Sequence, residues 1–452
     1  MRLCKEKYIR KGMGKKIQDG GIRYFFTKFF VDWAVRTSYR KFQVEGLENI
    51  PKDGSVIWAA NHTNALMDPL VMLATTPEQK VFVARADIFK KKAAVKWLRF
   101  LKIMPIYRIR DGIDAVKRND ESIAMATDVL LDGVPFVIYP EATHRPKHSL
   151  LKLSKGIFHI ALSVCDKMQE DKPVYIMPIG IEYGDYFRFR STVLVNFGKP
   201  FNVTEFVKEN GELPQPVQMV KMRELLTEKM AQQIVYVPDD EDYDATWEYA
   251  KLKAGNPRYF RSTIKAIEEK TGQKLKGLMK NQAVDRKAVQ DVLDLKESDP
   301  EAARSLLDKV EKLRIWRIQN GVSVNAIANN KRIIAAHVNI VLALIGLPYY
   351  LFCAVVSSIM WIPILCILRG IKDDAFYNTV RFATRFALLP IACIIWAVLY
   401  FCLLPWKWAL VLFLLSLPSL RFLYGYGAFF RRLCSDIRWF WKRGKSPDHN
   451  FE

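Results

Sequence analysis

The sequence lacks the residue patterns of several common kinds of site. None of its seven cysteines forms a Cys-x-x-Cys pair or a cluster with histidine, which argues against a structural zinc site and a disulfide framework. It has no Gly-x-Ser-x-Gly elbow for a nucleophilic serine, and no Walker-type loop for nucleotide phosphates. These absences disfavour a serine hydrolase and an ATP-driven enzyme.

Acidic residues are scarce relative to basic ones. The chain has 47 Asp and Glu against 69 Lys and Arg, which gives a formal net charge of +22. Half of the residues are hydrophobic, and this excludes a disordered polyelectrolyte. A basic, apolar chain suits either nucleic acid or an anionic phospholipid surface. No zinc-finger, RNP or KH signature is present, so we expect phospholipid rather than nucleic acid as the partner.

Charge is almost absent from two blocks of the C-terminal third. Residues 333–368 contain no Asp, Glu, Lys or Arg. A membrane-spanning helix needs about 20 apolar residues, so this block is too long for one perpendicular crossing and short for two. Pro348 and Pro363 are expected to break it into a re-entrant hairpin. Residues 386–420 contain only Lys407 as a charge.

The sequence around these blocks predicts an integral membrane region of paired hairpins. Pro405, Lys407 and two tryptophans lie together at the middle of the second block, which predicts a tight turn at a membrane–water interface. Every flank is basic, which places all flanks, and the globular region, on the cytoplasmic side. The basic flanking residues are Lys331, Arg332, Arg369, Lys372, Arg381, Arg385, Arg421, Arg431, Arg432, Arg438, Lys442 and Arg443.

Patterning divides the chain into five regions. Residues 1–41 combine a basic tail with the aromatic segment 22–36, either a helix lying at a membrane interface or one packed on the globular region. Residues 42–235 form a globular region, 236–332 a charged helical insert, 333–430 the membrane region and 431–452 a second basic tail. Ser298 is the expected N-cap of a helix within the insert.

The globular region alternates strand and helix patterns. Alternation of this kind predicts an α/β fold with a sheet flanked by helices, followed here by the helical insert and C-terminal transmembrane helices. The expected strands are 55–60, 80–85, 134–140, 173–183 and 192–200, and the expected helices include 112–132 and 154–168.

His62 and Asp68 follow the first of these strands and are the leading catalytic candidates. Histidine is the usual general base near neutral pH, and a buried carboxylate can fix its tautomer and stabilise the imidazolium. Six residues of straight helix rotate the side chain by about 240°. We therefore expect a turn between the two residues if they pair.

Further polar residues follow in a recognisable order. Arg108 ends the segment 104–108, and an apolar run leads into Glu141, Thr143 and Arg145. Lys155 follows these, and then come the apolar run with Pro178 and the segment 192–200. In order and spacing these residues resemble the four motif blocks of the glycerolipid acyltransferase family, over about residues 42–200.

Two departures resemble one branch of that family. Five residues separate His62 from Asp68 where most members have four, and Ala142 occupies the usual glycine position of the third block, with Arg145 one place late. Both are similar to the fungal and plant-like glycerol-3-phosphate acyltransferases. This resemblance implies acylation of a hydroxyl of glycerol 3-phosphate in phospholipid synthesis, with acyl-CoA or acyl carrier protein as thioester donor.

The resemblance also implies roles for the site residues. His62 is the expected general base, and Asp68 orients it. Arg108 is expected to clamp the acceptor phosphate, with Arg145 and Lys155 as further cations. Glu141 and Thr143 complete the expected substrate site, where Glu141 either binds glycerol hydroxyls or fixes the bases. The chemistry requires no metal or other cofactor.

Alternatives from the sequence stay open. Within the enzyme class, the chain could be a 1-acylglycerol-3-phosphate (lysophosphatidate) acyltransferase that makes phosphatidate. From another class, it could be a non-catalytic, lipid-binding membrane protein. His144 and His148 flank the third block and are secondary candidates for phosphate contact, whereas His159 is expected in the core.

Overall fold

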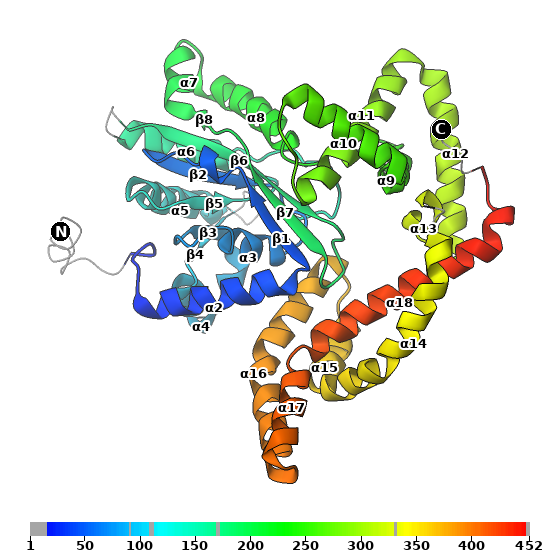
Figure 1. Ribbon diagram of the computed structural model, residues 1–452. Helices are drawn as coiled ribbons and strands as arrows, with labels where there is room; N and C mark the ends of the chain where they lie inside the picture. Colours follow the sequence, from blue (N-terminus) through cyan, green and yellow to red (C-terminus); the bar gives the residue numbers. More distant parts are fainter. Residues whose placement is uncertain (1–15, 90–91, 108–112, 169–171, 330–331, 449–452) are drawn as a thin grey trace.

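The central feature of the computed structural model is an eight-stranded mixed sheet (Figure 1). The structure describes residues 16–89, 92–107, 113–168, 172–329 and 332–448. The strands are β1 (Lys41–Glu45), β2 (Ser55–Ala60), β3 (Val81–Arg85), β4 (Ile103–Ile106), β5 (Phe136–Ile138), β6 (Val174–Tyr183), β7 (Thr192–Phe197) and β8 (Phe201–Asn202).

The strand order is β1-β7-β6-β2-β5-β3-β4, with β8 paired to β6. Strand β2 runs parallel to both of its neighbours, β5 and β6, while β6 and β7 pair antiparallel. The segments that follow β2 and β5 therefore leave the sheet at the same edge, which is where parallel α/β sheets place their ligand sites.

Helices cover both faces of the sheet. On one face Ile57 and Ile176 share a core with α5 (Ile113–Leu131), α6 (Gly156–Lys167) and α8 (Gln215–Ala231). On the other face Trp58 and Met177 pack with α2 (Ile22–Ser38) and α3 (Met67–Leu73). Burial of both faces explains why β2 reads as a continuous apolar run rather than an alternating one. Helices α4 (Lys92–Phe100) and α7 (Val203–Glu209) complete this part of the fold.

The predicted α/β class is confirmed, with small shifts at element ends. The five expected strands correspond to β2, β3, β5, β6 and β7, and the two expected helices to α5 and α6. Strand β5 is the largest deviation, because only Phe136–Ile138 of the expected 134–140 are extended. The chain turns away at Pro140, which has no backbone N–H for the ladder.

Helix α2 combines features of both interpretations of the segment 22–36. Ala34 and Val35 are buried against the sheet core. A row of aromatic side chains on the same helix is exposed, and it comprises Phe25, Phe26, Phe29, Phe30 and Trp33. The helix is therefore packed on the globular region and still presents an aromatic face.

A layer of helices follows the sheet and has its own core. Its members are α9 (Tyr243–Gly255), α10 (Pro257–Thr271), α11 (Leu278–Ser298), α12 (Pro300–Gln319) and α13 (Val324–Ala328). Ser298 was the wrong choice of N-cap, because it is the last residue of α11. Asp299 caps α12 instead, and its side chain accepts a hydrogen bond of 3.0 Å from the N–H of Ala302.

The apolar blocks form α14 (Arg332–Val356), α15 (Ser358–Leu368), α16 (Tyr377–Leu403), α17 (Trp406–Ser416) and α18 (Ser419–Lys442). Two stretches are long and apolar enough to cross a membrane, Ala335–Val356 and Asp374–Leu403. A third crossing is possible if α17 and α18, bent by 50° at their junction, act together. The expected turn at Pro405 lies between α16 and α17.

Pro348 and Pro363 do not end helices as expected. They lie inside α14 and α15, and the first block is interrupted at Ser357 instead. Apolar helices tolerate internal proline because neighbouring helices and local adjustments satisfy the freed carbonyl. Figure 1 shows α14 and α18 running together, with α16 and α17 forming the lower end of the molecule.

Candidate active site

The candidate site begins where β2 ends. The Asn61 side chain continues the pairing of β2 with β6, since its Oδ1 accepts from Ile181 N (2.6 Å) and its Nδ2 donates to Ile181 O (3.1 Å). These two bonds hold the chain at the strand end in a defined position. His62 therefore leaves the sheet at a fixed point on its carboxyl edge.

His62 and Asp68 are brought into direct contact. The His62 Nδ1 and Asp68 Oδ2 atoms are 2.7 Å apart. The predicted turn lies between them, where Ala65 takes a φ of 40° before α3 begins at Met67. A positive φ is unfavourable for alanine, so the surrounding contacts stabilise this turn.

Asp68 is fully buried and accepts four hydrogen bonds. Besides His62, its Oδ2 accepts from the backbone N–H groups of Thr63 (2.7 Å) and Asn64 (2.8 Å). Its Oδ1 accepts from the Tyr183 hydroxyl (2.7 Å). Burial, reinforced by the charge of Asp68, raises the pKa of Tyr183, so this hydroxyl keeps its proton and remains a donor. The four donors fix the carboxylate rigidly beneath the imidazole.

The His62 ring presents one nitrogen for chemistry. It stacks on Tyr139 with ring centroids 4.6 Å apart, and its side chain is 19% exposed. A carboxylate only accepts hydrogen bonds, so Nδ1 carries the proton, and in the neutral imidazole Nε2 then carries the lone pair. Within the described part of the chain, no hydrogen bond occupies Nε2. The arrangement is that of an oriented general base.

Glu141 joins the loops that follow β2 and β5. Its Oε1 accepts from His62 N (2.9 Å) and its Oε2 from Leu151 N (2.8 Å). Burial raises the pKa of this carboxyl group, although the two backbone donors partly oppose the shift. Both oxygens already have partners, so Glu141 positions His62 rather than facing open solvent. These two contacts go to backbone N–H groups and not to the basic residues that Glu141 was expected to fix, and they give it a third role, holding the His62 backbone in place.

The remaining predicted residues lie in different environments. Arg145 pairs with Asp239 and donates to Ser149 Oγ (2.7 Å), and its backbone N–H donates to His62 O (3.1 Å). Thr143 is exposed beside it, and Lys155 is exposed immediately before α6. Arg108 lies outside the described residues.

Ala142 in the third block has a backbone conformation that is unusual for alanine. Ala142 has a φ of 59°, in the left-handed region that glycine adopts without strain. This is the position where the resembled family has glycine. Alanine thus adopts the left-handed conformation here, and bonds such as that from Ala142 N to Tyr139 O (3.1 Å) support the strain.

A second histidine–carboxylate pair flanks the first and was missed from the sequence. His144 Nε2 lies 3.0 Å from Asp373 Oδ2, and the rings of His144 and His62 are 5.5 Å apart. Asp373 belongs to the connection between α15 and α16. The Ala375 N–H and His144 both lower the pKa of Asp373. The only signal in the sequence was two adjacent acids in an otherwise basic connection.

The start of α16, which follows this connection, contacts the loop after β6. Asn378 and Asn64 both donate from Nδ2 to the carbonyl oxygen of Tyr186, at 2.5 Å and 2.9 Å. The hydroxyl of Tyr183, on the strand leading to this loop, is the one that binds Asp68. The apolar C-terminal region is therefore attached directly to the surroundings of His62.

Two other histidines are placed differently from expectation. His148 is buried against Trp247, with ring centroids 3.9 Å apart, and burial lowers its pKa to about 3. It is therefore a neutral core residue rather than a phosphate ligand. His159 was expected in the core, and this was wrong, because it is exposed on α6.

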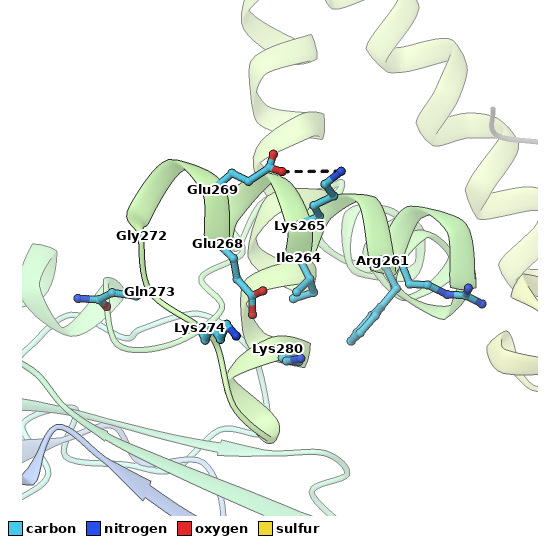
Figure 2. A pocket seen from close by; sticks show the side chains of 10 residues that line it. Arg261, Ile264, Lys265, Glu268, Glu269, Gly272, Gln273, Lys274 and Lys280 are labelled. Carbon is cyan, nitrogen blue, oxygen red and sulfur yellow. Dashed lines mark ion pairs between the residues drawn. The ribbon is translucent and has the colours of Figure 1, made fainter.

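A separate cavity lies in the helical layer, away from His62. Figure 2 shows side chains of α10 and the following loop around a space of about 570 Å³, including Arg261, Glu268 and Lys274. Glu268 there accepts from Leu275 N (2.9 Å). Its walls come from residues 260–280 and contain neither member of the His62–Asp68 pair. In the described ranges, no group of three His, Cys, Asp or Glu side chains is arranged to hold a metal ion.

The match to a family model agrees with the residue pattern. Residues 41–182 match the family described as Acyltransferase. Among solved structures, the chain is similar to the 1-acyl-sn-glycerophosphate (LPA) acyltransferase PlsC from Thermotoga maritima, with 23% identity and a TM-score of 0.35. That similarity covers 46% of this chain and 77% of the other. A search of curated proteins gave no match. The segment that matches the Acyltransferase family is thus the one that contains His62, Asp68 and Glu141.

Proposed function

We propose that this protein is a membrane-bound O-acyltransferase that moves a fatty acyl group from a thioester to a hydroxyl of glycerol 3-phosphate. The observation that carries the proposal is the buried Asp68 carboxylate bound to His62 Nδ1, with Nε2 left for a substrate hydroxyl. The match of residues 41–182 to the Acyltransferase family supports the reaction class.

The proposed reaction needs no covalent enzyme intermediate. Nε2 of His62 takes the proton of the acceptor hydroxyl as its oxygen attacks the thioester carbonyl. The new C–O bond forms, the C–S bond breaks, and His62 returns the proton to the departing thiolate. Asp68 stabilises the imidazolium that exists between these two transfers. Acyl-CoA or acyl carrier protein is the thioester donor in this proposal.

Recognition of the acceptor phosphate is proposed for Arg145, Lys155 and Arg108. Arg145 is already paired with Asp239, so its guanidinium is only partly available. Lys155 is exposed, and Arg108 retains the role implied by the motif blocks. Thr143, exposed next to His144, is a further proposed contact for the substrate.

An acceptor assay on purified protein tests the function. With labelled acyl-CoA or acyl carrier protein, we expect labelled 1-acylglycerol 3-phosphate from glycerol 3-phosphate, at least tenfold faster than phosphatidate from lysophosphatidate. The five-residue spacing between His62 and Asp68 supports this preference. Faster conversion of lysophosphatidate would assign the alternative acceptor, and no transfer to either would contradict the proposal.

We propose that the connection between α15 and α16 lies on the same membrane face as His62. The contact of Asp373 with His144 supports this placement. In sealed vesicles, an impermeant maleimide should label Lys372→Cys and Glu212→Cys from one face and Lys407→Cys from the other. All three residues are exposed. The variants are made in a background without the native reactive cysteines. Labelling of positions 372 and 212 from opposite faces would refute the model of paired hairpins. Cytoplasmic orientation is proposed from the basic flanks.

A further inference from the structure

An open groove lies between α14 and α18, which pack along each other. Its volume is about 640 Å³. One wall belongs to α14 and the other to α18, and the lining is aliphatic and aromatic: Leu342, Ile345, Tyr349, Phe422, Tyr426 and Phe429. This apolar lining suits a hydrocarbon chain.

Two arginines close one end of this groove. Arg190, from the loop between β6 and β7, and Arg421, near the start of α18, both line it. Arg385 of α16 lies within electrostatic reach of both. In the described ranges, none of these three arginines forms a salt bridge. Three positively charged side chains therefore lie near one another, and no described carboxylate is paired with them.

Arg190 shows the unbalanced charge most clearly. Its Nη1 is buried and has no hydrogen-bond partner in the part of the chain that the structure describes. Burial lowers the pKa of Arg190, and the charges of Arg421 and Arg40 lower it further. Its backbone has a φ of 60°, an unfavourable conformation for arginine. A buried, unpaired donor is costly unless a ligand satisfies it.

The chemistry of the groove specifies an amphiphile. Guanidinium groups bind phosphate oxygens bidentately, and Arg190 and Arg421 are the cations positioned to do so. The lining beyond them is apolar. The groove thus has a cationic end and an apolar body. Its cationic end lies where the part of the chain that contains the sheet meets the apolar helices, which is the level at which lipid headgroups would lie.

We propose that this groove binds an anionic glycerophospholipid from the bilayer, with its phosphate at Arg190 and Arg421 and an acyl chain between α14 and α18. The inference does not depend on the proposed acyl transfer, because the groove is lined by neither His62 nor Asp68. The lipid would act as a bound structural component at the junction.

Native mass spectrometry of the full chain in neutral detergent tests the headgroup. We expect dioleoyl phosphatidylglycerol to bind at least about tenfold more tightly than dioleoyl phosphatidylcholine, because both lipids offer the phosphate but the arginines repel the choline ammonium of the second. Arg421→Gln should remove most of this preference. Arg369→Gln, an equally exposed arginine outside the groove, should retain it. Equal binding of the two lipids, or equal effects of the two variants, would overturn the proposal.

A second pair of variants tests the acyl chain without altering charge. Gly425 lines the groove, and a Cβ added there meets no atom within 4 Å. Gly425→Leu should therefore fill the groove and weaken phosphatidylglycerol binding about tenfold, while thermal unfolding stays near that of the unaltered chain. Gly427→Leu, two residues along the same helix, is the control and should bind normally.

Other occupants give different results. If inorganic phosphate alone displaces phosphatidylglycerol at equal concentration, the site takes a free anion and the lipid assignment is wrong. If the protein binds phosphatidylglycerol and phosphatidylcholine equally, and Gly425→Leu dissociates a dimer formed by the unaltered chain, the groove is an interface with a second copy of the chain and the lipid assignment is wrong. Unchanged lipid binding by Gly425→Leu would likewise contradict the position of the acyl chain.

Discussion

Replacement of His62 by alanine is expected to lower kcat for acyl transfer by roughly 10²–10⁴-fold, the usual contribution of a general base. The substitution removes Nε2 and the bond to Asp68, so the acceptor hydroxyl would have to attack without losing its proton to the protein. The measurement is kcat for the purified protein with saturating acceptor and thioester.

The alanine variant should remain folded. The contacts of His62 with Glu141 and Arg145 are made by its backbone N–H and carbonyl, which alanine keeps. Thermal unfolding in detergent and recovery from membranes measure this directly. His159→Ala, on the exposed side of α6, is the matched histidine control and should retain full activity. If His62→Ala keeps more than a tenth of the activity, His62 is not the base.

Replacement of Asp68 by asparagine should reduce kcat on the order of 10³-fold, since the imidazolium loses its counter-charge. The amide can preserve the geometry. Its oxygen can still accept from His62 Nδ1 and from the N–H groups of Thr63 and Asn64, while its NH₂ turns toward the Tyr183 hydroxyl oxygen. We therefore expect a large loss of kcat with a small change in KM and in thermal stability.

Tyr183→Phe gives the graded comparison for Asp68. It removes one of the four hydrogen bonds to the carboxylate but leaves its charge and its contact with His62. The loss should be about tenfold or less, in keeping with a net contribution of about 1 kcal/mol for one hydrogen bond. Activity of Asp68→Asn within tenfold of the unaltered protein would show that the carboxylate charge is not required.

The site was predictable where it depends on local sequence, and less so where it depends on distant segments. His62, Asp68 and Glu141 each follow a strand, and strands beside one another in a parallel sheet bring their carboxyl ends together. Asp239 and Asp373 could not be assigned, because each reaches the site from a separate region. Arg145 was expected to be free to bind phosphate, but it forms an ion pair with Asp239.

Some predictions of where helices begin and end failed because the packed structure allows other positions for these ends. Proline was expected to interrupt the first apolar block, yet Pro348 and Pro363 lie within helices. An apolar helix cannot exchange backbone bonds for bonds to lipid, so it stays intact and its neighbours support the distortion. Ser298 and Asp299 are both good capping residues, and proline at 300 suits the first helical position after Asp299.

By itself the sequence determined the α/β pattern, the two apolar blocks and the residues able to perform acid–base chemistry, because periodicity, composition and side-chain type are local properties. Only the tertiary structure decided the left-handed turn at Ala65, the four donors around Asp68, and the contact of Asp373 with His144. It also decided the gathering of Arg190, Arg385 and Arg421. The bond of Tyr183 to Asp68, the contact of Asp373 with His144 and the arginine cluster each join segments far apart in the chain. Their contact energies exist only once the sheet and the apolar helices have packed together.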